Sequence, residues 1–288
     1  MVVRAFAKIN LGLEVVRRRP DGYHEIRTLF QSIDLADTIE LEPSPDGRIR
    51  LEGDDPSVPW DRSNLVYRAA ALLQERTGTP SGVLIRVAKA VPPGKGLGGG
   101  SSDAALTLYA LNRLWSLGLG PEALADLALS LGSDVPYFLH GGLCLGESRG
   151  EALTRLDDFR PLPCVLVFPP YPIFTADIYA GFGPFLTSEG KDSKIMRFLG
   201  TGDFGLLEND LELVILRRYP ELEEFKRFFQ DRGAMLSLVT GSGSAVFGLF
   251  SDGDKAREAH DQLRGQSVVR LATTLPREGY WTQVGAGV

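Results

Sequence analysis

The sequence predicts an α+β fold, in which helices and strands are mixed along the chain and the strands pair mainly antiparallel. Residues 2–16 are apolar and β-branched with a partial period of two, which is typical of a strand. Residues 83–91 are predicted to form a strand that runs into a glycine-rich loop and then a helix. Residues 235–250 are predicted to form two short strands joined by a Gly-Ser-Gly-Ser turn. With no repeat of fixed period, the chain of 288 residues is one large domain or two tightly joined lobes.

The first half of the chain begins with that strand, followed by an Asp-Gly turn over residues 17–22. Residues 28–43 are predicted to form two more strands. Ser63-Asn64 offers an N-cap for a helix that ends at Gly78. After the glycine loop, two apolar stripes predict a helix over 105–115 that is buried on two sides. A further helix from Pro121 and a hairpin complete this half.

The second half begins near residues 162–172, a predicted strand that ends in prolines and marks a lobe boundary. We therefore expect one lobe over residues 1–158 and another over residues 159–288. The remaining predicted elements are helices near 191–200, 205–217 and 219–231, the paired strands, a helix over 254–264 and a strand over 267–274.

Composition narrows the class of protein. Apolar residues make up 43% and charged residues 24%, as in ordinary soluble proteins, and the net charge of −6 argues against a nucleic-acid or membrane-surface binder. Cys144 and Cys164 have no metal-ligand spacing and are expected to be reduced core thiols. Arg4, Lys8 and Glu14 interrupt the first apolar stretch, so we expect no signal peptide, and no run approaches the length of a membrane span. We expect a cytoplasmic enzyme.

The glycine loop has the features of a phosphate-binding site. Five of the seven residues from Gly94 to Gly100 are glycine, between a strand and a helix. Backbone N–H groups and the positive end of a helix dipole favour an anion there. Ser101 and Ser102 follow at the junction, where one can cap the helix and one can reach a phosphate or a magnesium ion.

Three other interpretations of this loop compete. A Walker A loop requires Gly-Lys followed by Ser or Thr at its end, whereas Lys95 is followed by Gly96. A dinucleotide fingerprint, G-x-G-x-x-G, is formally present, but no βαβ unit precedes it. A tightly packed structural loop explains the glycines but not the two hydroxyls.

The full string over residues 92–105, PPGKGLGGGSSDAA, resembles the phosphate-binding signature of the GHMP kinases. Two further blocks support this resemblance: AFAKINLGL near the N-terminus and TGSGSAVF near the C-terminus. The resemblance covers essentially the whole chain. It implies a two-lobed fold, with an N-terminal lobe of the ribosomal S5 domain 2-like type and a ferredoxin-like C-terminal lobe.

Shorter strings refine the resemblance: KINL at residue 8, RPDGYH at 19, GSDVP at 132 and ENDLE at 208. Together they are similar to the branch that uses ATP and Mg²⁺ to phosphorylate the C2 hydroxyl of a cytidine-diphosphate-linked methylerythritol, in the non-mevalonate route to isoprenoid precursors. The resemblance thus implies small-molecule partners, with no nucleic acid and no membrane. We expect a monomer or a weak homodimer.

The catalytic residues implied by the resemblance are Lys8 and Asp134, with Asn10 beside them. A carboxylate is a weak base for an alcohol, so Asp134 needs an electrostatic partner. The ammonium of Lys8 can stabilise the developing alkoxide and the transferred phosphoryl group. Without the resemblance, Lys8 would be a solvated strand lysine and Asp134 a helix cap.

The binding residues are implied in the same way. Tyr23 and His24 are expected to hold the cytosine, and Tyr179, near Thr175, to close the stack from the second lobe, where the family usually has Phe. Asn64 caps a helix or contacts adenine, and Ser101 or Ser102 holds the metal through Mg-ATP. Gly241, Ser242 and Gly243 make a hairpin turn or a loop over the phosphates. The expected ATP-binding set is Pro93, Gly94, Gly96, Leu97, Gly98, Gly99, Gly100, Ser101, Ser102 and Asn64.

Two other functions remain to be weighed. A homoserine or mevalonate-type kinase of the same superfamily has no use for a base-binding aromatic and histidine at residues 21–24. A non-catalytic relative would have lost Lys8, Asp134 or the glycine loop, and all three are present.

Overall fold

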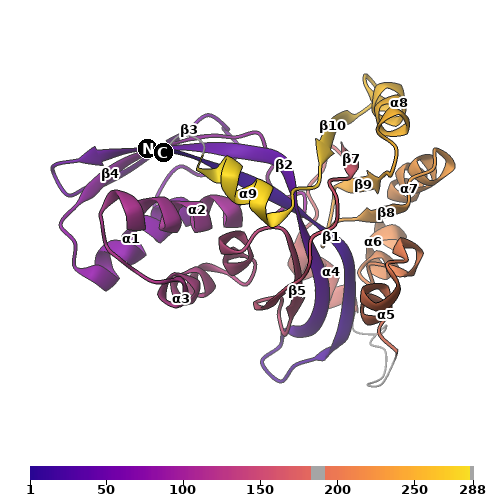
Figure 1. Ribbon diagram of the computed structural model, residues 1–288, viewed down its shortest axis with the longest axis horizontal. Helices are drawn as coiled ribbons and strands as arrows, with labels where there is room; N and C mark the ends of the chain where they lie inside the picture. The colour runs from indigo at the N-terminus through magenta and orange to yellow at the C-terminus, as the bar shows by residue number, and fades with distance from the viewer. Residues whose placement is uncertain (183–191, 286–288) are drawn as a thin grey trace.

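A computed structural model describes residues 1–182 and 192–285 (Figure 1). Its central feature is a long antiparallel hairpin of β1 (Val2–Arg18) and β2 (His24–Ser44), joined through the Asp-Gly turn. The prediction of two strands over residues 28–43 is wrong, because β2 is continuous. β1 pairs with β2 from His24 to Glu40, with three register shifts along the way.

The first sheet adds four shorter strands to this hairpin. They are β3 (Ile49–Gly53), β4 (Gly82–Ala88), β5 (Leu143–Glu147) and β6 (Ala152–Arg155), in the order β3-β4-β2-β5-β6 with β1 paired to β2. Helices α1 (Leu65–Thr77), α2 (Gly99–Leu114) and α3 (Pro121–Leu131) lie together beside this sheet in Figure 1. Buried aliphatic residues of the sheet and of all three helices form one core.

Both ends of α1 agree with the sequence. The Asn64 side chain accepts a hydrogen bond from the Val66 N–H, and Gly78 closes the helix in the left-handed conformation. The start of α2 differs from the prediction, because the helix begins at Gly99 rather than at residue 105. Gly98 occupies the N-cap without a side-chain bond, and Ser102 does not cap but donates to the Phe6 carbonyl at 2.7 Å.

The second lobe is built on an antiparallel sheet in the order β10-β7-β9-β8. The strands are β7 (Pro163–Phe168), β8 (Leu236–Val239), β9 (Val246–Leu249) and β10 (Val268–Thr273). The helices are α4 (Thr175–Phe182), α5 (Lys194–Thr201), α6 (Glu212–Arg218), α7 (Glu221–Asp231) and α8 (Gly253–Leu263).

One helix of this lobe was predicted wrongly. Residues 205–217 are not one helix, because a 3-10 turn over Phe204–Leu206 and an irregular stretch precede α6. In that stretch the buried Asn209 side chain donates to the Val239 and Gly241 carbonyls, each at 2.8 Å. A helix through Asn209 would be incompatible with this tertiary contact.

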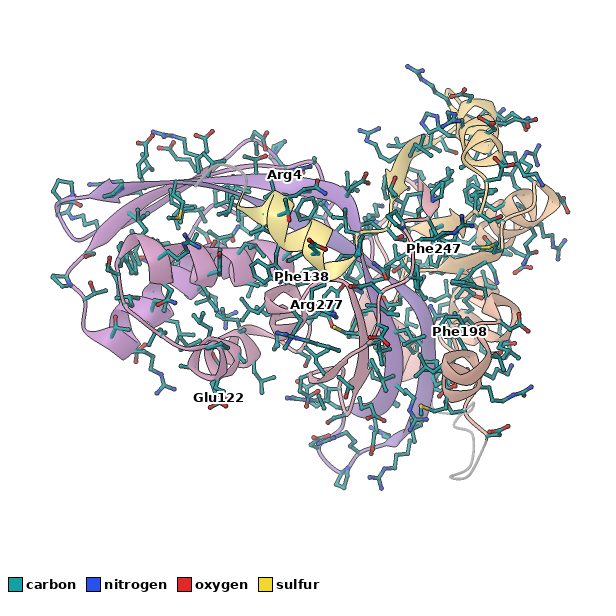
Figure 2. All side chains as sticks on the ribbon, in the orientation of Figure 1. Arg4, Glu122, Phe138, Phe198, Phe247 and Arg277 are labelled. Carbon is teal, nitrogen blue, oxygen red and sulfur yellow. The ribbon has the colours of Figure 1, made fainter. Side chains whose placement is uncertain are left out.

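The two lobes share a continuous apolar cluster. Ile9 and Leu29 of the hairpin and Leu166 and Phe247 of the second sheet belong to it, and Figure 2 labels Phe247 in the second lobe. Such a contact joins the lobes firmly. Cys164 lies in the same cluster, and both cysteines are free and buried, as expected.

The last helix, α9 (Arg277–Val284), was not predicted and returns to the first lobe. Its Tyr280 hydroxyl donates to the Phe138 carbonyl at 2.7 Å, and Trp281 donates to the His140 carbonyl at 3.0 Å (Phe138 and Arg277 are labelled in Figure 2). The division of the chain at residue 158 stays a prediction. Among the described residues, no helix has the length and apolar character that crossing a membrane requires.

Candidate active site

A cavity of about 1060 Å³ lies between the lobes and collects most of the predicted site residues. All three predicted catalytic residues line it, as do both predicted cytosine contacts. Its other predicted residues are Pro93, Gly94, Gly96, Leu97, Gly98, Gly99, Gly100, Ser101, Thr175, Tyr179, Gly241, Ser242 and Gly243. Asn64 and Ser102 are not among the lining residues: Leu65 reaches the cavity in place of Asn64, whose carboxamide is occupied by the α1 cap.

Lys8 and Asn10 come from a short segment of β1 bounded by two register shifts against β2. Because they are two residues apart, they share one face of the strand, while Ile9 between them packs into the core. Lys8 is 4% exposed, and its Nζ donates to Asn10 Oδ1 at 2.7 Å and to the Gly96 carbonyl at 2.9 Å. Burial lowers the pKa of Lys8, and Asp134 partly opposes this effect.

Asp134 stands at the first residue before a 3-10 helix over Val135–Leu139, yet its side chain makes no capping bond among the described residues. Its Oδ2 lies 3.7 Å from Lys8 Nζ, and the side chain is 40% exposed. The carboxylate is therefore accessible from the cavity and free of a capping role. A carboxylate and an ammonium in this arrangement can accept a proton and stabilise the alkoxide that remains.

A buried network fixes Asn10 beside Lys8. Asn10 Nδ2 donates to Thr28 Oγ1 at 2.8 Å, and the Asn10 N–H donates to Thr240 Oγ1 at 3.0 Å. The Thr28 hydroxyl then donates to the Gly12 carbonyl. Neither threonine was predicted as a site residue, because a threonine in a strand or next to a glycine turn has no chemical signature of its own.

The glycine loop is shaped by left-handed backbone at alternate residues, with φ of +68° at Gly94, +78° at Gly96 and +69° at Gly98. A Cβ on Gly96 would lie 2.2 Å from the Thr240 carbonyl oxygen, so the loop here touches the second lobe directly. The loop ends in the first turn of α2, where Gly99, Gly100 and Ser101 line the cavity, so the N-terminal end of this helix, the positive end of its dipole, lies at the cavity.

Aromatic side chains occupy another part of the cavity wall. The His24 ring stacks on Tyr179 with centroids 5.1 Å apart, and Tyr23 is 57% exposed with the Arg149 guanidinium over its ring. Burial and Arg18 lower the pKa of His24, and its buried Nε2 has no hydrogen-bond partner among the described residues. Thr175 and Ser242 are hydrogen bonded at 2.7 Å across the same wall. Arg149 belongs to no motif and was not predicted.

Comparison with known proteins decides the family. Profiles of the GHMP kinases N terminal domain and of the GHMP kinases C terminal region match residues 64–142 and 195–268. A 4-diphosphocytidyl-2-C-methyl-D-erythritol kinase from Pelotomaculum thermopropionicum is 45% identical over 271 residues, which cover 92% of this chain and 94% of that protein. This chain belongs to the 4-diphosphocytidyl-2-C-methyl-D-erythritol kinases.

Other relatives agree with this kinase family. The protein of the same name from Chloroherpeton thalassium is 42% identical and covers 91% of this chain, which spans 93% of its length. A crystal structure of 4-(cytidine 5'-diphospho)-2C-methyl-D-erythritol kinase is 39% identical, with a TM-score of 0.82 over 95% of this chain and 99% of that one. Homoserine kinase from Cytophaga hutchinsonii is 18% identical, with a TM-score of 0.74 over 97% and 96% of the two chains, and shares the fold. The predicted two-lobed α+β fold of a GHMP kinase is thereby confirmed.

A buried ionic cluster lies between the strand that precedes the kinase's glycine loop and the helix that follows it. Lys89, at the end of β4, donates to Asp37 at 2.5 Å and to Asp103 of α2 at 2.7 Å, and all three side chains are at most 6% exposed. Burial raises the pKa of Asp103 to about 8, against the opposing charge of Lys89. The cluster ties the strand before the loop to the helix after it. Its members are too far apart in the sequence for any spacing to indicate it.

Gly96→Ala is expected to destabilise the kinase and weaken ATP binding, because the new methyl group would meet the Thr240 carbonyl in a left-handed backbone. Gly118→Ala is the matched control, since Gly118 has φ of +70° but nothing within 4 Å of the point that a Cβ would occupy. Thermal unfolding should show a loss of about 1 kcal/mol for the control and at least about twice that for Gly96→Ala. Equal losses would mean that the contact with Thr240 does not constrain the loop.

Proposed function

We propose that this chain transfers the γ-phosphoryl group of ATP to the C2 hydroxyl of 4-diphosphocytidyl-2-C-methyl-D-erythritol, in the non-mevalonate route to isoprenoid precursors. The observation that carries the proposal is the Lys8–Asp134 pair, 3.7 Å apart, in a cavity that the glycine loop and the His24–Tyr179 stack also line. An acceptor held by its base against the aromatic wall and ATP held by the glycine loop would both reach this pair.

In the proposed reaction, Asp134 accepts the proton of the acceptor's C2 hydroxyl. The oxygen of that hydroxyl forms a bond to the γ-phosphorus of ATP, and the bond between the γ-phosphorus and the oxygen that remains on ADP breaks. The Lys8 ammonium stabilises the negative charge that develops on the oxygens in transfer. Asn10 and the Gly96 carbonyl aim the ammonium by accepting two of its three hydrogens. The N–H groups of the glycine loop and of the first turn of α2 bind the phosphates.

Mg²⁺ fits this site as a companion of ATP rather than as a resident metal. The described residues contain no group of three or more His, Cys, Asp or Glu side chains that could hold an ion. Mg²⁺ in kinases commonly takes one or two protein oxygens and completes its shell with phosphates and water. Of the two serines proposed, Ser101 lines the cavity while Ser102 is committed to Phe6, so we propose the Ser101 hydroxyl as its protein ligand. The ion would neutralise phosphate charge.

The proposal is tested by ADP release with ATP, Mg²⁺ and each of three acceptors: 4-diphosphocytidyl-2-C-methyl-D-erythritol, homoserine and mevalonate. Turnover with only the first is expected. Turnover with homoserine or mevalonate would retain the phosphate-binding loop but overturn the acceptor. If none of the three acceptors leads to ADP release while ATP still raises the melting temperature, the acceptor assignment would be rejected as well.

Tyr23→Ala is expected to raise KM for the cytidyl substrate about tenfold and to leave KM for ATP within twofold, because the exposed ring offers a face on which a base can stack. Tyr23→Phe keeps the ring and is the matched control, expected to behave like wild type. Steady-state kinetics with each substrate varied in turn gives both constants. Equal changes in the two KM values for Tyr23→Ala would show that Tyr23 shapes the lobe and not the base pocket.

A further inference from the structure

Lys95 is the lysine of the glycine loop, and neither the proposed chemistry nor a Walker A comparison gives it a task. Its Nζ donates to the Pro169 carbonyl at 2.6 Å, to the Tyr171 carbonyl at 2.6 Å and to Ser244 Oγ at 3.3 Å. An ammonium has three hydrogens, so these three acceptors occupy all of them. All three acceptors belong to the second lobe, although Lys95 belongs to the first.

The backbone around Lys95 makes the same connection. The Lys95 carbonyl accepts the Ala245 N–H at 3.2 Å, and Ser244 Oγ donates to the Tyr171 carbonyl at 2.8 Å. The next carbonyl, that of Gly96, accepts the Lys8 ammonium. The glycine loop, which accepts a hydrogen bond from the catalytic Lys8, is therefore bound to the second lobe through both the side chain and the carbonyl of Lys95.

The segments that Lys95 holds lead into the acceptor side of the cavity. Residues 169–171 precede α4, which supplies Thr175 and Tyr179 to the cavity wall. Ser244 follows Ser242 and Gly243, which line it as well. A displacement of either segment would move the acceptor wall relative to the glycine loop.

We infer that Lys95 is a positioning residue that holds the ATP loop in register with the acceptor-binding segments of the second lobe, and that its ammonium is not a phosphate ligand. This inference rests on the proposed function for its kinetic part. A lysine that bound phosphate would have to leave two carbonyl oxygens and a hydroxyl without their donor. Burial lowers the pKa of Lys95, in agreement with an ammonium enclosed by neutral acceptors.

The structural part is tested without any ligand, by hydrogen exchange on wild type and on Lys95→Met. The variant is expected to exchange at least about tenfold faster at the amides of Tyr171 and Ile173 and of residues 243–246, with the first sheet unchanged. Lys255→Met is the matched control, because Lys255 is an exposed lysine on α8. Unchanged exchange at both segments would overturn the inference, whatever the enzyme's substrate is.

The kinetic part separates positioning from phosphate binding. For Lys95→Met we expect the affinity for β,γ-methylene ATP alone to stay within about threefold, while KM for the cytidyl acceptor rises about tenfold. Lys95→Arg should not restore that KM, because a planar guanidinium does not match three convergent acceptors. A tenfold loss of analogue affinity with an unchanged acceptor KM, or full rescue by arginine, would make Lys95 a phosphate ligand and overturn the inference.

Ser244→Ala provides a second route if Lys95→Met fails to fold. It removes one acceptor of the ammonium and the bond to the Tyr171 carbonyl. A smaller increase of exchange over the same residues is expected, and its absence would count against the inference. If wild type does not turn over the cytidyl acceptor, the proposed function fails, while the exchange measurements still decide the role of Lys95.

Discussion

Asp134→Asn is expected to lower kcat by at least about 10²-fold, which corresponds to about 2.7 kcal/mol of transition-state stabilisation, while the affinity for ATP stays within about twofold. The amide has the shape of the carboxylate but cannot accept the proton of the hydroxyl. The side chain makes no capping bond among the described residues, so the melting temperature should change little. Because the base acts only in the transition state, the loss should fall on kcat rather than on substrate binding.

The measurement is single-turnover and steady-state ADP formation at saturating substrates, beside Asp177→Asn. Asp177 is an exposed acid in the first turn of α4 and does not line the cavity, so this control should retain wild-type kcat. Asp134 also raises the pKa of Lys8. The residual activity of Asp134→Asn should therefore fall at a lower pH than that of wild type, as Lys8 loses its proton more readily. A kcat near that of wild type would remove Asp134 from the mechanism.

Lys8→Met is expected to lower kcat by about 10³-fold, because it removes the ammonium that opposes charge in the transferred group. The same change should cost little stability, and the melting temperature should stay within a few degrees of wild type or rise. Burial lowers the pKa of Lys8, which means that removing its charge from water costs free energy in the folded state. Lys8→Met removes this cost. After the change, the Thr240 hydroxyl can donate its one hydrogen to either Asn10 Oδ1 at 3.3 Å or the Gly96 carbonyl at 3.4 Å, which leaves only one of the two acceptors without a donor.

The pH dependence of unfolding checks the cause. A lysine whose pKa is lowered in the folded state binds fewer protons there than in the unfolded chain, so wild-type stability should gain from rising pH between the lowered pKa and the ordinary lysine value of 10.5. Lys8→Met lacks this gain. Identical pH dependence in the two proteins, or a large loss of stability in Lys8→Met at pH 7, would show that the ammonium is a structural partner instead of a strained catalytic group.

The parts of the fold that were predicted correctly are those determined by neighbouring residues in the sequence. The parts that were missed depend on contacts between distant segments. The α1 helix was predicted well because Asn64 and Gly78 determine its ends locally. The glycine loop was found because its composition is unusual, although Gly99 and Gly100 turned out to begin α2. The helix predicted over 205–217 was wrong because the Asn209 side chain bonds to the distant Val239 and Gly241 carbonyls.

The site shows the same contrast. Lys8, Asn10 and Asp134 were identified from short motifs, and the structure brings them to one cavity. The residues that hold Asn10 in place, Thr28 and Thr240, have ordinary side chains and act through contacts between distant segments. The position of Tyr23 also needed the structure, because His24 rather than Tyr23 is the ring that stacks on Tyr179.

The return of α9 to the first lobe has a consequence for how the protein is made. Buried residues Leu275, Tyr280 and Val284 belong to the same core as Val3 and Phe6. During synthesis, the hairpin and its helices leave the ribosome long before α9 does, and domains generally fold as they emerge. The first lobe must therefore wait, with a partly open core, until the second lobe has been translated. A ribosome that stalls within the second lobe would release neither lobe in a finished form.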